Sequence, residues 1–475
     1  MRDQHLKTLV IDLDGTLIKT DLLVESLFLL LRQNPFSLFL LPFWLLSGKA
    51  RLKQEIATRV DLDINSLPYN EQLIKYIEVE KVKGRPIVLA TASFEKYAKQ
   101  IAEHLDIFDQ VLASNGQLNL SGHNKKDKLL DLFGAKGFVY AGNAHVDLKV
   151  WEAASSAIVV NPEPGLLNKV RARFEIEALL DNQVSMLSSL VKATRVHQWV
   201  KNILIFVPIL LSHTSINISS LWDGIIAFFS FSLCASSVYL LNDLIDLPDD
   251  RKHKSKCNRP FASGQLSPIV GLTGIPILFL LSLALASSLT VEFVISLCSY
   301  FVLTLLYSFW LKRKVLIDVI SLASLYTTRI IAGACAIGLF PSFWLLSFSM
   351  FFFLSLAIIK RYSELLELKA KGEKSIPGRG YESNDIELMA SLGGSSGYVS
   401  VLVLALYLNS IEVRAQYTHP EYLWLICPII LYWISRAWLI AHRGIMHDDP
   451  IVWAIRDKLS HIAGITLFVI ALFAK

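Results

Sequence analysis

The apolar positions divide the chain into two parts of different character. Before about residue 195, short apolar runs alternate with charged, helix-like sequence, whereas residues 196–475 contain one long apolar stretch after another. Short runs of that kind are typical of buried parallel strands, and stretches approaching about 20 residues are typical of membrane-spanning helices. The pattern therefore predicts an α/β head followed by an all-α integral membrane domain.

Four apolar runs predict the strands of the head, with a helical pattern between successive runs. They cover residues 8–13, 86–90, 138–141 and 157–160. This alternation favours a doubly wound, Rossmann-like parallel sheet. Polar residues stand where the strands are expected to end: Asp12, Asp14, Thr91, Asn143 and Asp147. Because the carboxyl ends of parallel strands meet at one edge of a sheet, these side chains are expected to share one site.

The second part of the chain predicts nine membrane spans. Their approximate limits are 199–213, 219–241, 268–290, 292–310, 316–339, 341–359, 391–411, 421–440 and 461–474. Lys and Arg gather in the loops after the second, fourth, sixth and eighth spans, whereas the loops of the other side contain Arg414 alone. This bias predicts that the head and the basic loops lie on the cytoplasmic side of a bacterial inner membrane. The N-terminal sequence MRDQHLKTLVIDLDGT, which lacks a secretory pattern, agrees with that orientation.

Three segments follow from these patterns. We expect the head over residues 1–175, a linker helix over 176–194 and the membrane domain over 195–475. Pro162, Pro164 and Gly165 mark the break before the linker, and an amphipathic pattern follows them.

Composition and charge narrow the class of protein. Of the 475 residues, 53% are hydrophobic and 18% are charged, which excludes a disordered chain and argues against a purely soluble one. The net charge of +5 is modest, and the basic residues lie in loops between apolar stretches, so a nucleic-acid partner is not expected. Five widely separated cysteines without a CxxC pair predict neither a disulfide framework nor a zinc site.

The head carries four short motifs in order: DLDGT, ATAS, a lysine in GHNKKDKLLDLFG, and AGNAHVD. Over about residues 6–175 this series resembles the haloacid dehalogenase phosphatases. The resemblance implies that Asp12 attacks phosphorus, while Asp14 protonates the leaving oxygen and later activates water. It also implies Mg²⁺ between the Asp12 carboxylate, the Asp14 carbonyl and Asp147.

The resemblance extends to the groups that hold the phosphate. Thr91 would hold the phosphoryl oxygens, with Ser93 as the alternative, and Lys125 would neutralise them. Asn143 departs from the pattern, because it stands where the family usually has the first of two acids. A non-catalytic, regulatory head is therefore the alternative.

Residues 22–48, between the first two motifs, contain the apolar run FSLFLLPFWLLSG. The run is interrupted by polar residues and is too short for a full span. We expect either a pair of cap helices over the site or a segment that lies on the bilayer.

The chemistry of the membrane part concentrates at the end of the second span, in YLLNDLIDLPDDRKHKSKCNRP. Asp243, Asp246 and Asp250 have the spacing i, i+3 and i+7, which places them on one face of a helix. Clustered carboxylates near a membrane need a compensating cation, and oxygen ligands suit Mg²⁺ carrying a diphosphate. Four neighbours are candidates for the remaining charge of the substrate: Asn242, His253, Lys256 and Arg259.

The string NDxxDxxxD resembles the first motif of the UbiA-type intramembrane transferases, which are all-helical and usually move a prenyl group. That superfamily has a second aspartate motif after the fourth span, whereas this chain has Asp318 followed by Leu322 there. Together with RVHQWVKN, IIKRYSELLEL and RGIMHDDPIVWAIRDKLS, the region 194–475 resembles the branch of decaprenyl-phosphate phosphoribosyltransferases.

The resemblance implies phosphoribosyl pyrophosphate as the donor and a polyprenyl phosphate in the membrane as the acceptor. The Mg²⁺-bound diphosphate would lie on the three aspartates, with Lys312 and Lys360 as phosphate partners. Arg329 and Arg361 are candidates for the lipid phosphate or the ribose 5-phosphate. Tyr307 is a further candidate, because it stands out with Lys312 and Arg329 in the region where the second aspartate motif is missing. Three acids of the last basic loop are candidates for ribose or metal: Asp448, Asp449 and Asp457.

The leading interpretation is a membrane phosphoribosyltransferase whose head removes the 5-phosphate of the lipid product. The alternative is an aromatic prenyltransferase that uses a prenyl diphosphate and carries a regulatory head. Lipid chain length is not predicted, and a homo-oligomer stays an open alternative.

Overall fold

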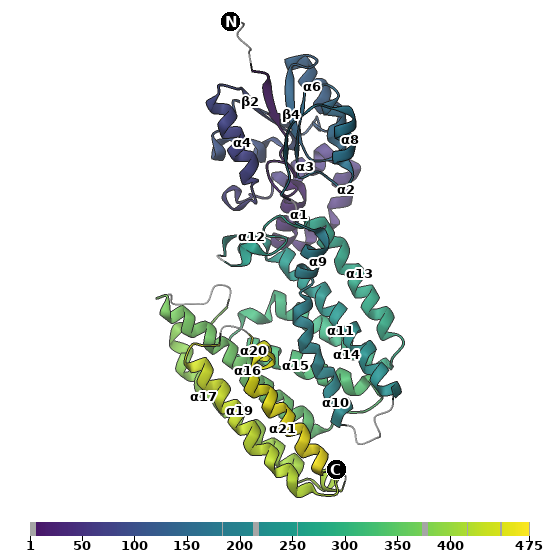
Figure 1. The fold of residues 1–475 in the computed structure, drawn as a ribbon, viewed down its shortest axis with the longest axis vertical. Coiled ribbons are helices and arrows are strands. Elements are labelled where there is room, and N and C mark those ends of the chain that lie inside the picture. The colour runs from purple at the N-terminus through teal and green to yellow at the C-terminus, as the bar shows by residue number, and fades with distance from the viewer. Residues whose placement is uncertain are drawn as a thin grey trace. The chain divides into compact units, whose positions relative to one another are not determined.

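The computed structural model describes residues 6–182, 184–211, 218–253, 255–372, 379–415, 417–446 and 449–474. The chain forms two compact units (Figure 1). The head unit comprises Met1–Thr194 and Tyr239–Gly274, and the bundle unit comprises Arg195–Val238 and Ile275–Lys475. The loop after the long apolar helix Ile218–Ile245 carries most of the aspartate motif and belongs to the head unit.

A six-stranded parallel sheet with the order β3-β2-β1-β4-β5-β6 forms the core of the head unit. The strands are β1 (Thr8–Ile11), β2 (Ile87–Phe94), β3 (Gln110–Ser114), β4 (Phe138–Gly142), β5 (Ala157–Val160) and β6 (Ile176–Leu180). Helices connect them: α4 (Glu71–Val82), α5 (Glu95–Leu105), α6 (His123–Phe133), α7 (Leu148–Trp151) and α8 (Leu166–Arg173). The predicted doubly wound α/β class is thus confirmed.

Both faces of the sheet are buried because successive strand residues point to opposite sides. Leu9 and Ile11 pack into one apolar cluster with Ile77 and Ile101, whereas Val10 packs into another on the opposite face. The four predicted strands are therefore recovered as the buried strands β1, β2, β4 and β5.

The sheet also contains two strands that the sequence analysis did not predict, β3 and β6. Residues of β6 alternate between half-buried and exposed positions and pair with β5, as in Ile158 with Ala178. The sheet thus continues past residue 175, and a helix throughout 176–194 is wrong. Only α9 (Met186–Ala193) is helical in that stretch of described residues.

The segment between β1 and β2 forms α1 (Leu22–Gln33), η1 (Pro35–Phe39), α2 (Leu41–Leu46) and α3 (Lys49–Ala57). Asp21 caps α1 by accepting hydrogen bonds from the backbone N–H groups of Leu23 and Val24. The apolar side chains of η1 and α2 stay largely exposed, including Phe36, Phe39, Phe43 and Leu46. The segment is helical, and much of its apolar surface is exposed. Both a cap over the site and a segment on the bilayer stay predictions.

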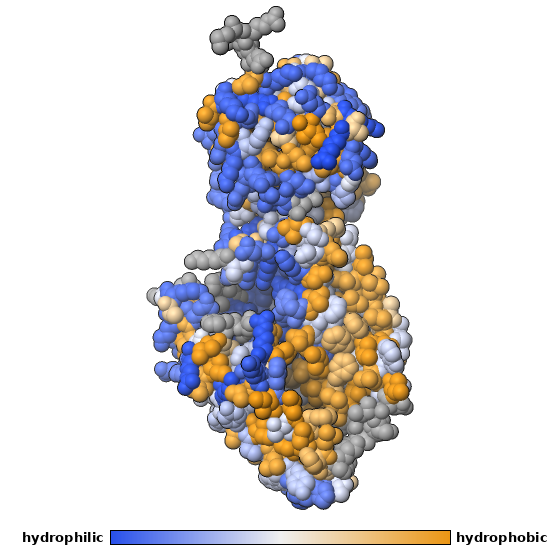
Figure 2. All heavy atoms as spheres, viewed as in Figure 1, coloured by the Kyte–Doolittle hydropathy of each residue, from blue (hydrophilic) through white to orange (hydrophobic). Residues whose placement is uncertain are grey.

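Long apolar helices build the bundle unit, and two of them continue into the head unit. They are α11 (Ile218–Ile245), α13 (Pro268–Ala286), α14 (Val291–Phe309), α15 (Ile317–Ala336), α16 (Phe343–Ala370), α17 (Ile386–Leu408), α19 (Ile426–His442) and α21 (Lys458–Ala474). Hydrophobic residues cover much of their visible surface (Figure 2). Leu280, Ile295, Leu402 and Phe473 are each more than half exposed, as expected for helices that face lipid.

Among the described residues, seven helices are long and apolar enough to cross a membrane. An eighth span results if α20 (Pro450–Arg456) and α21, which meet at a bend of 83°, are counted as one. The nine predicted spans are therefore corrected to seven or eight. The first predicted span is instead a short 3-10 segment, η4 (Val196–Ile205), followed by α10 (Phe206–Leu211), because polar residues such as Lys201 and Asn202 interrupt its apolar run.

Helix α15 is the most buried of the long helices. It packs against α14, α16, α10 and η4. Gly333 is required there, because a Cβ on it would lie 2.0 Å from the carbonyl oxygen of Ile205. This close approach holds η4 against the middle of the bundle.

Candidate functional sites

The head site forms at the carboxyl ends of β1 and β4. Asp12 follows β1, and its Oδ1 lies 2.7 Å from the Lys125 Nζ, which comes from the first turn of α6. Lys125 also contacts the Tyr140 hydroxyl at 2.9 Å, and that hydroxyl donates to Asp147 Oδ1 at 3.0 Å. Three of the predicted residues, Asp12, Lys125 and Asp147, are therefore joined in one buried network, and Tyr140 is the member that the sequence analysis missed.

Asp14 lies in the turn after β1 and is held by two donors. Its Oδ1 accepts from the backbone N–H of Leu22 at 2.9 Å, and its Oδ2 accepts from the Ser93 hydroxyl at 2.6 Å. The hydroxyl of Thr91, which is fully buried, accepts from the Ser93 backbone N–H. Thr91 thus supports the turn in which Ser93 contacts Asp14.

Asn143 packs against the DLDGT turn. Its Oδ1 accepts from the Thr16 hydroxyl at 3.1 Å, and its backbone N–H donates to Asp147 Oδ2. Gly15 has a φ of +75°, and a Cβ there would lie 2.4 Å from Asn143 Nδ2. The amide therefore ties the first motif to the last one.

The carboxylates of the head outnumber the cations that contact them. Burial raises the pKa of Asp14 to about 7, with a further contribution from the charge of Asp21. Burial also raises the pKa of Asp147 to about 6, together with the charge of Asp12. Burial lowers the pKa of the nearby Lys53, which donates to the Ala92 carbonyl oxygen. Buried carboxylates with raised pKa values favour an additional cation.

This donor set fits a magnesium ion. Oxygen ligands from carboxylates and carbonyls are the ones that Mg²⁺ prefers. The described residues contain no group of three His, Cys, Asp or Glu side chains in metal-binding geometry. The ligand set implied by the motifs needs only two carboxylates, from Asp12 and Asp147, and the carbonyl oxygen of Asp14.

The aspartate motif lies where α11 ends. The helix stops at Ile245, Asp246 is the N-terminal cap position of α12 (Leu247–Lys252), and the predicted continuous helix face is therefore wrong. Asp243 and Asp250 nevertheless come together, because Arg259 Nη1 lies 3.2 Å from Asp243 Oδ1 and also donates to Asp250 Oδ2. Both carboxylates are almost completely buried.

The Asp243–Asp250 pair has the chemistry of a cation site. Burial raises the pKa of Asp250, against the opposing charge of Arg259. A guanidinium lies between two buried carboxylate oxygens, which shows that the pair attracts positive charge, and such oxygens suit Mg²⁺. Asp246 and Asn242 are half-buried nearby, whereas His253 and Lys256 lie on the exposed part of the loop.

The same loop contacts the head through α1. Arg251 forms a buried ion pair with Glu25 at 2.6 Å, and Glu25 also accepts from the Thr20 hydroxyl. Two exposed ion pairs, Arg32–Asp249 and Lys252–Asp63, lie in the same region. Since Leu22 of α1 contacts Asp14, one short helix touches both the head site and the aspartate-motif loop.

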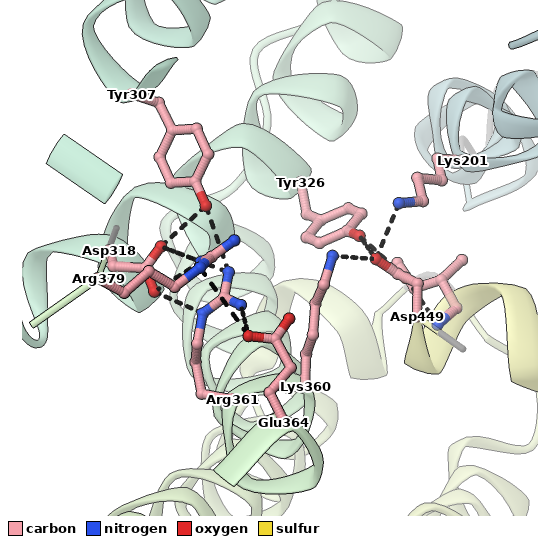
Figure 3. Close-up of polar contacts among 10 residues, drawn as sticks. Lys201, Tyr307, Asp318, Tyr326, Lys360, Arg361, Glu364, Arg379 and Asp449 are labelled. Carbon is pink, nitrogen blue, oxygen red and sulfur yellow. Dashed lines mark hydrogen bonds and ion pairs between the residues drawn. The ribbon is translucent and has the colours of Figure 1, made fainter. Parts of the chain in front are cut away.

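Two polar clusters lie in the bundle unit (Figure 3). In the first, Asp318 is completely buried and pairs with Arg361, Arg379 and the Tyr307 hydroxyl. Arg361 also donates to Glu364. Two arginines and two acids balance, so this cluster is neutral.

The second cluster surrounds Asp449, just before α20. Lys201 and Lys360 lie 2.8 and 3.2 Å from the same oxygen, Oδ2, and the Tyr326 hydroxyl donates to both oxygens. Burial acts to raise the pKa of Asp449, but the charges of Lys360 and Lys201 outweigh it and hold that pKa well below its usual range. Sequence analysis missed Lys201 and Tyr326, although Lys201 stands out as a charge in an apolar stretch.

Among the remaining candidates of the membrane part, Arg329 borders the second cluster, since its guanidinium carbon lies 5.5 Å from the centre of the Tyr326 ring. Arg329 is buried and donates to Asn202 Oδ1, to the Leu325 carbonyl oxygen and to the Tyr300 hydroxyl. Lys312 is half-buried in η6 (Leu311–Arg313). Asp457 pairs with Arg436 through two hydrogen bonds, and Asp448 lies outside the described residues.

The structure combines a parallel sheet with aspartates at its strand ends, a buried aspartate pair and long apolar helices, the architecture expected of a hydrolase-like head joined to a membrane domain. Comparison with protein families agrees. Residues 203–452 match the UbiA prenyltransferase family, and residues 9–152 match the haloacid dehalogenase-like hydrolases. The chain therefore belongs to the UbiA prenyltransferase family and carries a haloacid dehalogenase-like domain at its N-terminus.

Curated relatives share these parts to different extents. An uncharacterized protein of Sinorhizobium fredii, y4nM, is 36% identical over 96% of this chain and 89% of its own length. The nodulation protein NoeC of Azorhizobium caulinodans is 38% identical over 58% of this chain and 90% of its own length. The decaprenyl-phosphate phosphoribosyltransferase of Mycobacterium tuberculosis is 35% identical over 38% of this chain and 61% of its own length. The predicted resemblance to both families is confirmed.

Proposed function

We propose that the membrane part transfers 5-phosphoribose from phosphoribosyl pyrophosphate to a polyprenyl phosphate. The bond between the anomeric carbon and the diphosphate breaks, and an oxygen of the lipid phosphate forms the new bond. Asp243 and Asp250 would hold the diphosphate through Mg²⁺, which stabilises the charge of the leaving group. The lipid phosphate is already an anion, so the step needs no strong base.

The observation that carries this proposal is that Asp318 forms ion pairs with two arginines. This acid stands where a prenyl-transferring relative has its second metal-binding motif, and here it is paired with Arg361 and Arg379. A carboxylate neutralised by two guanidinium groups is a poor ligand for a second Mg²⁺. The similarity to the decaprenyl-phosphate phosphoribosyltransferases supports the same donor.

Two parallel reactions test the donor. Purified protein with Mg²⁺ receives either phosphoribosyl pyrophosphate and a polyprenyl phosphate, or a prenyl diphosphate and hydroxybenzoate. We expect a labelled lipid in the first reaction. Product in the second reaction alone would favour the aromatic prenyltransferase.

We propose that the head then hydrolyses the 5-phosphate of the lipid product. Asp12 would attack phosphorus while Asp14 delivers a proton to the leaving ribose oxygen, and water would afterwards release the phosphate from Asp12. Lys125, which contacts Asp12, would neutralise the transferred group. The contact between Glu25 and Arg251 supports cooperation of the two reactions, because it joins α1 to the loop that carries Asp250.

The exposed apolar surface of η1 and α2 supports a head that acts at the bilayer. Phe36, Phe39 and Leu46 are each at least 70% exposed, and basic residues flank them, among them Lys49 and Arg51. Apolar side chains with basic neighbours are typical of segments that lie on an anionic membrane surface. We place this surface on the cytoplasmic side of a bacterial inner membrane, as the loop charges predict.

A single substitution separates the two reactions. Asp12→Asn should stop the release of phosphate from the lipid product and leave ribosyl transfer intact. Thin-layer separation of the lipids made from labelled donor measures both. Equal accumulation of the phosphorylated lipid in parent and variant would assign the head to a soluble substrate or to regulation.

A further inference from the structure

The buried arginines and lysines of the bundle unit differ in the number and charge of the protein groups that they contact. Arg361 directs all three of its nitrogens to Asp318, Glu364 and Tyr307. Arg329 likewise directs all three nitrogens to protein oxygens. These hydrogen bonds anchor both guanidinium groups between helices.

Lys201 and Lys360 are in a different situation. Among the described residues, the two ammonium groups share one oxygen of a single carboxylate, Asp449. The other acid near Lys360 is Glu364, which is already paired with Arg361, so positive charge exceeds negative charge by one. The side chains of Lys201 and Lys360 are 11% and 32% exposed, which makes the excess charge a partly buried one. A buried excess of positive charge is costly unless an anion compensates it.

A cavity opens beside this cluster. Its polar wall consists of Lys201, Lys360, Tyr326 and Asp449. The rest of the lining is apolar and comes from α15, α16 and α20: Leu322, Leu356, Ala357, Pro450 and Ile451. The volume of about 50 Å³ is room for a few water molecules or one small anion. A phosphate group fits this volume, and a hydrocarbon chain attached to it would leave the cavity past the apolar side chains.

We propose that Lys201, Lys360 and Tyr326 bind the phosphate of the membrane acceptor, a phosphate monoester on an apolar chain. This assignment rests on the proposed function and adds the acceptor site to it. A phosphate monoester carries up to two negative charges and three acceptor oxygens, so it can satisfy both ammonium groups and the phenol at once. Asp449 is the anion that it competes with, since the carboxylate occupies the same three donors.

Direct binding tests the site without depending on turnover. The full chain in lipid nanodiscs is titrated with farnesyl phosphate, and farnesol, inorganic phosphate and ribose 5-phosphate are titrated in parallel. We expect Lys201→Met and Lys360→Met each to weaken farnesyl phosphate binding by about tenfold or more, the loss typical of a hydrogen bond to a charged group. Binding of ribose 5-phosphate should change by less than about twofold.

Three further variants make the result specific. Asp449→Asn removes the competing charge, and we expect it to tighten farnesyl phosphate binding, an effect that damage to the fold would not produce. Lys369→Met removes an exposed lysine from the end of the same helix and should leave every titration unchanged. Lys360→Arg should restore part of the affinity.

The outcomes separate this site from the proposed function. Parent-like farnesyl phosphate binding in both lysine variants overturns the site, even if ribosyl transfer is observed. Loss of ribose 5-phosphate binding alone also overturns it, because it assigns the lysines to the donor. Lysine-dependent farnesyl phosphate binding in a protein without ribosyl transfer supports the site and rejects the proposed reaction.

Discussion

The head site and the lysine cluster of the bundle unit are both buried polar sites, but their charges are unbalanced in opposite directions. In the head, three carboxylates face one directly bonded cation, Lys125. In the bundle unit, two lysines face one carboxylate, Asp449. A neutral cluster, built from Arg361, Arg379, Asp318 and Glu364, lies beside the lysine cluster, since Arg361 follows Lys360 directly on α16.

The difference separates binding sites from structural clusters. A buried cluster whose charges cancel stabilises packing and needs nothing more. A cluster with an excess charge lowers its energy by binding an ion of opposite sign. The head site thus suits a divalent cation, and the lysine cluster suits an anion. The following experiments test this distinction, from the largest expected effect to the smallest.

The first experiment removes the aspartate pair of the α11–α12 junction. Asp243→Ala or Asp250→Ala should reduce ribosyl transfer by roughly 10²–10³-fold, because each deletes a ligand of the metal-bound diphosphate. Asp249→Ala is the matched control, since that carboxylate is 64% exposed on the same short helix. Transfer is measured with labelled phosphoribosyl pyrophosphate. Activity within a few fold of the parent in both variants would contradict the assignment.

The second experiment compares neighbouring cations on α16. Arg361→Met should destabilise the protein by about 3–5 kcal/mol, because it leaves the buried Asp318 and Glu364 with an unbalanced charge. Lys360→Met should cost much less, since Asp449 keeps Lys201 and Tyr326. Thermal unfolding in detergent measures both. If the two variants have the same unfolding temperature, the balanced and unbalanced clusters do not differ as proposed.

The third experiment tests a balanced cluster in the head. Arg85 is buried between Glu80 and Glu177, and Arg85→Met should destabilise the head by about 3 kcal/mol. Burial acts to raise the pKa of both acids, but hydrogen bonds outweigh it and lower both pKa values: from Lys83 and then Arg85 at Glu80, and from Arg85 at Glu177.

The pH dependence of this cluster has a definite sign. Carboxylates with lowered pKa values stabilise the folded state above their ordinary pKa of about 4.5, and the contribution is lost as the pH falls below that value. Chemical denaturation between pH 7 and pH 3, followed by fluorescence, should show a smaller pH effect in the Arg85 variant than in the parent. An identical pH profile would remove the cluster as the cause.

The fourth experiment concerns the exposed surface of η1 and α2. Replacing Phe43 and Leu46 by serine should lower phosphate release from a lipid substrate by about two- to fivefold, because membrane contact concentrates the head on that substrate. Release from p-nitrophenyl phosphate should be unchanged, since both side chains are exposed and outside the site. A parallel loss on both substrates would indicate damage to the head instead.

Much of the head could be predicted from local sequence. The strands β1, β2, β4 and β5 are short runs of apolar residues, and such runs bury on both faces whatever their neighbours are. Strands β3 and β6 lie at the edges of the sheet and are only partly buried, so their sequences QVLAS and IEALL carry weaker patterns. Their assignment depends on pairing with β2 and β5, which only the tertiary structure provides.

In the membrane part, too, some elements could be predicted from local sequence and others could not. Long apolar stretches determined the existence of α11, α13, α14, α15, α16, α17 and α19 as potential spans, because hydropathy is a local property. The apolar pattern does not encode helix type or bends. It therefore did not show that the described part of the first predicted span begins as a 3-10 segment, or that the last helix follows a bend of 83°.

The sequence by itself determined that the chain combines a haloacid dehalogenase-like head with a UbiA-type membrane domain, since the motifs at strand and helix ends are contiguous. It also singled out Asp243, Asp250, Lys360 and Arg361 by residue type. Only the tertiary structure decided which cations are balanced, because that depends on partners far away in the chain. Arg361 pairs with Asp318, which lies on another helix. Lys360 shares Asp449 with Lys201, and Lys201 lies 248 residues before Asp449 in the chain. Charge balance is a property of the folded neighbourhood, and no local pattern contains it.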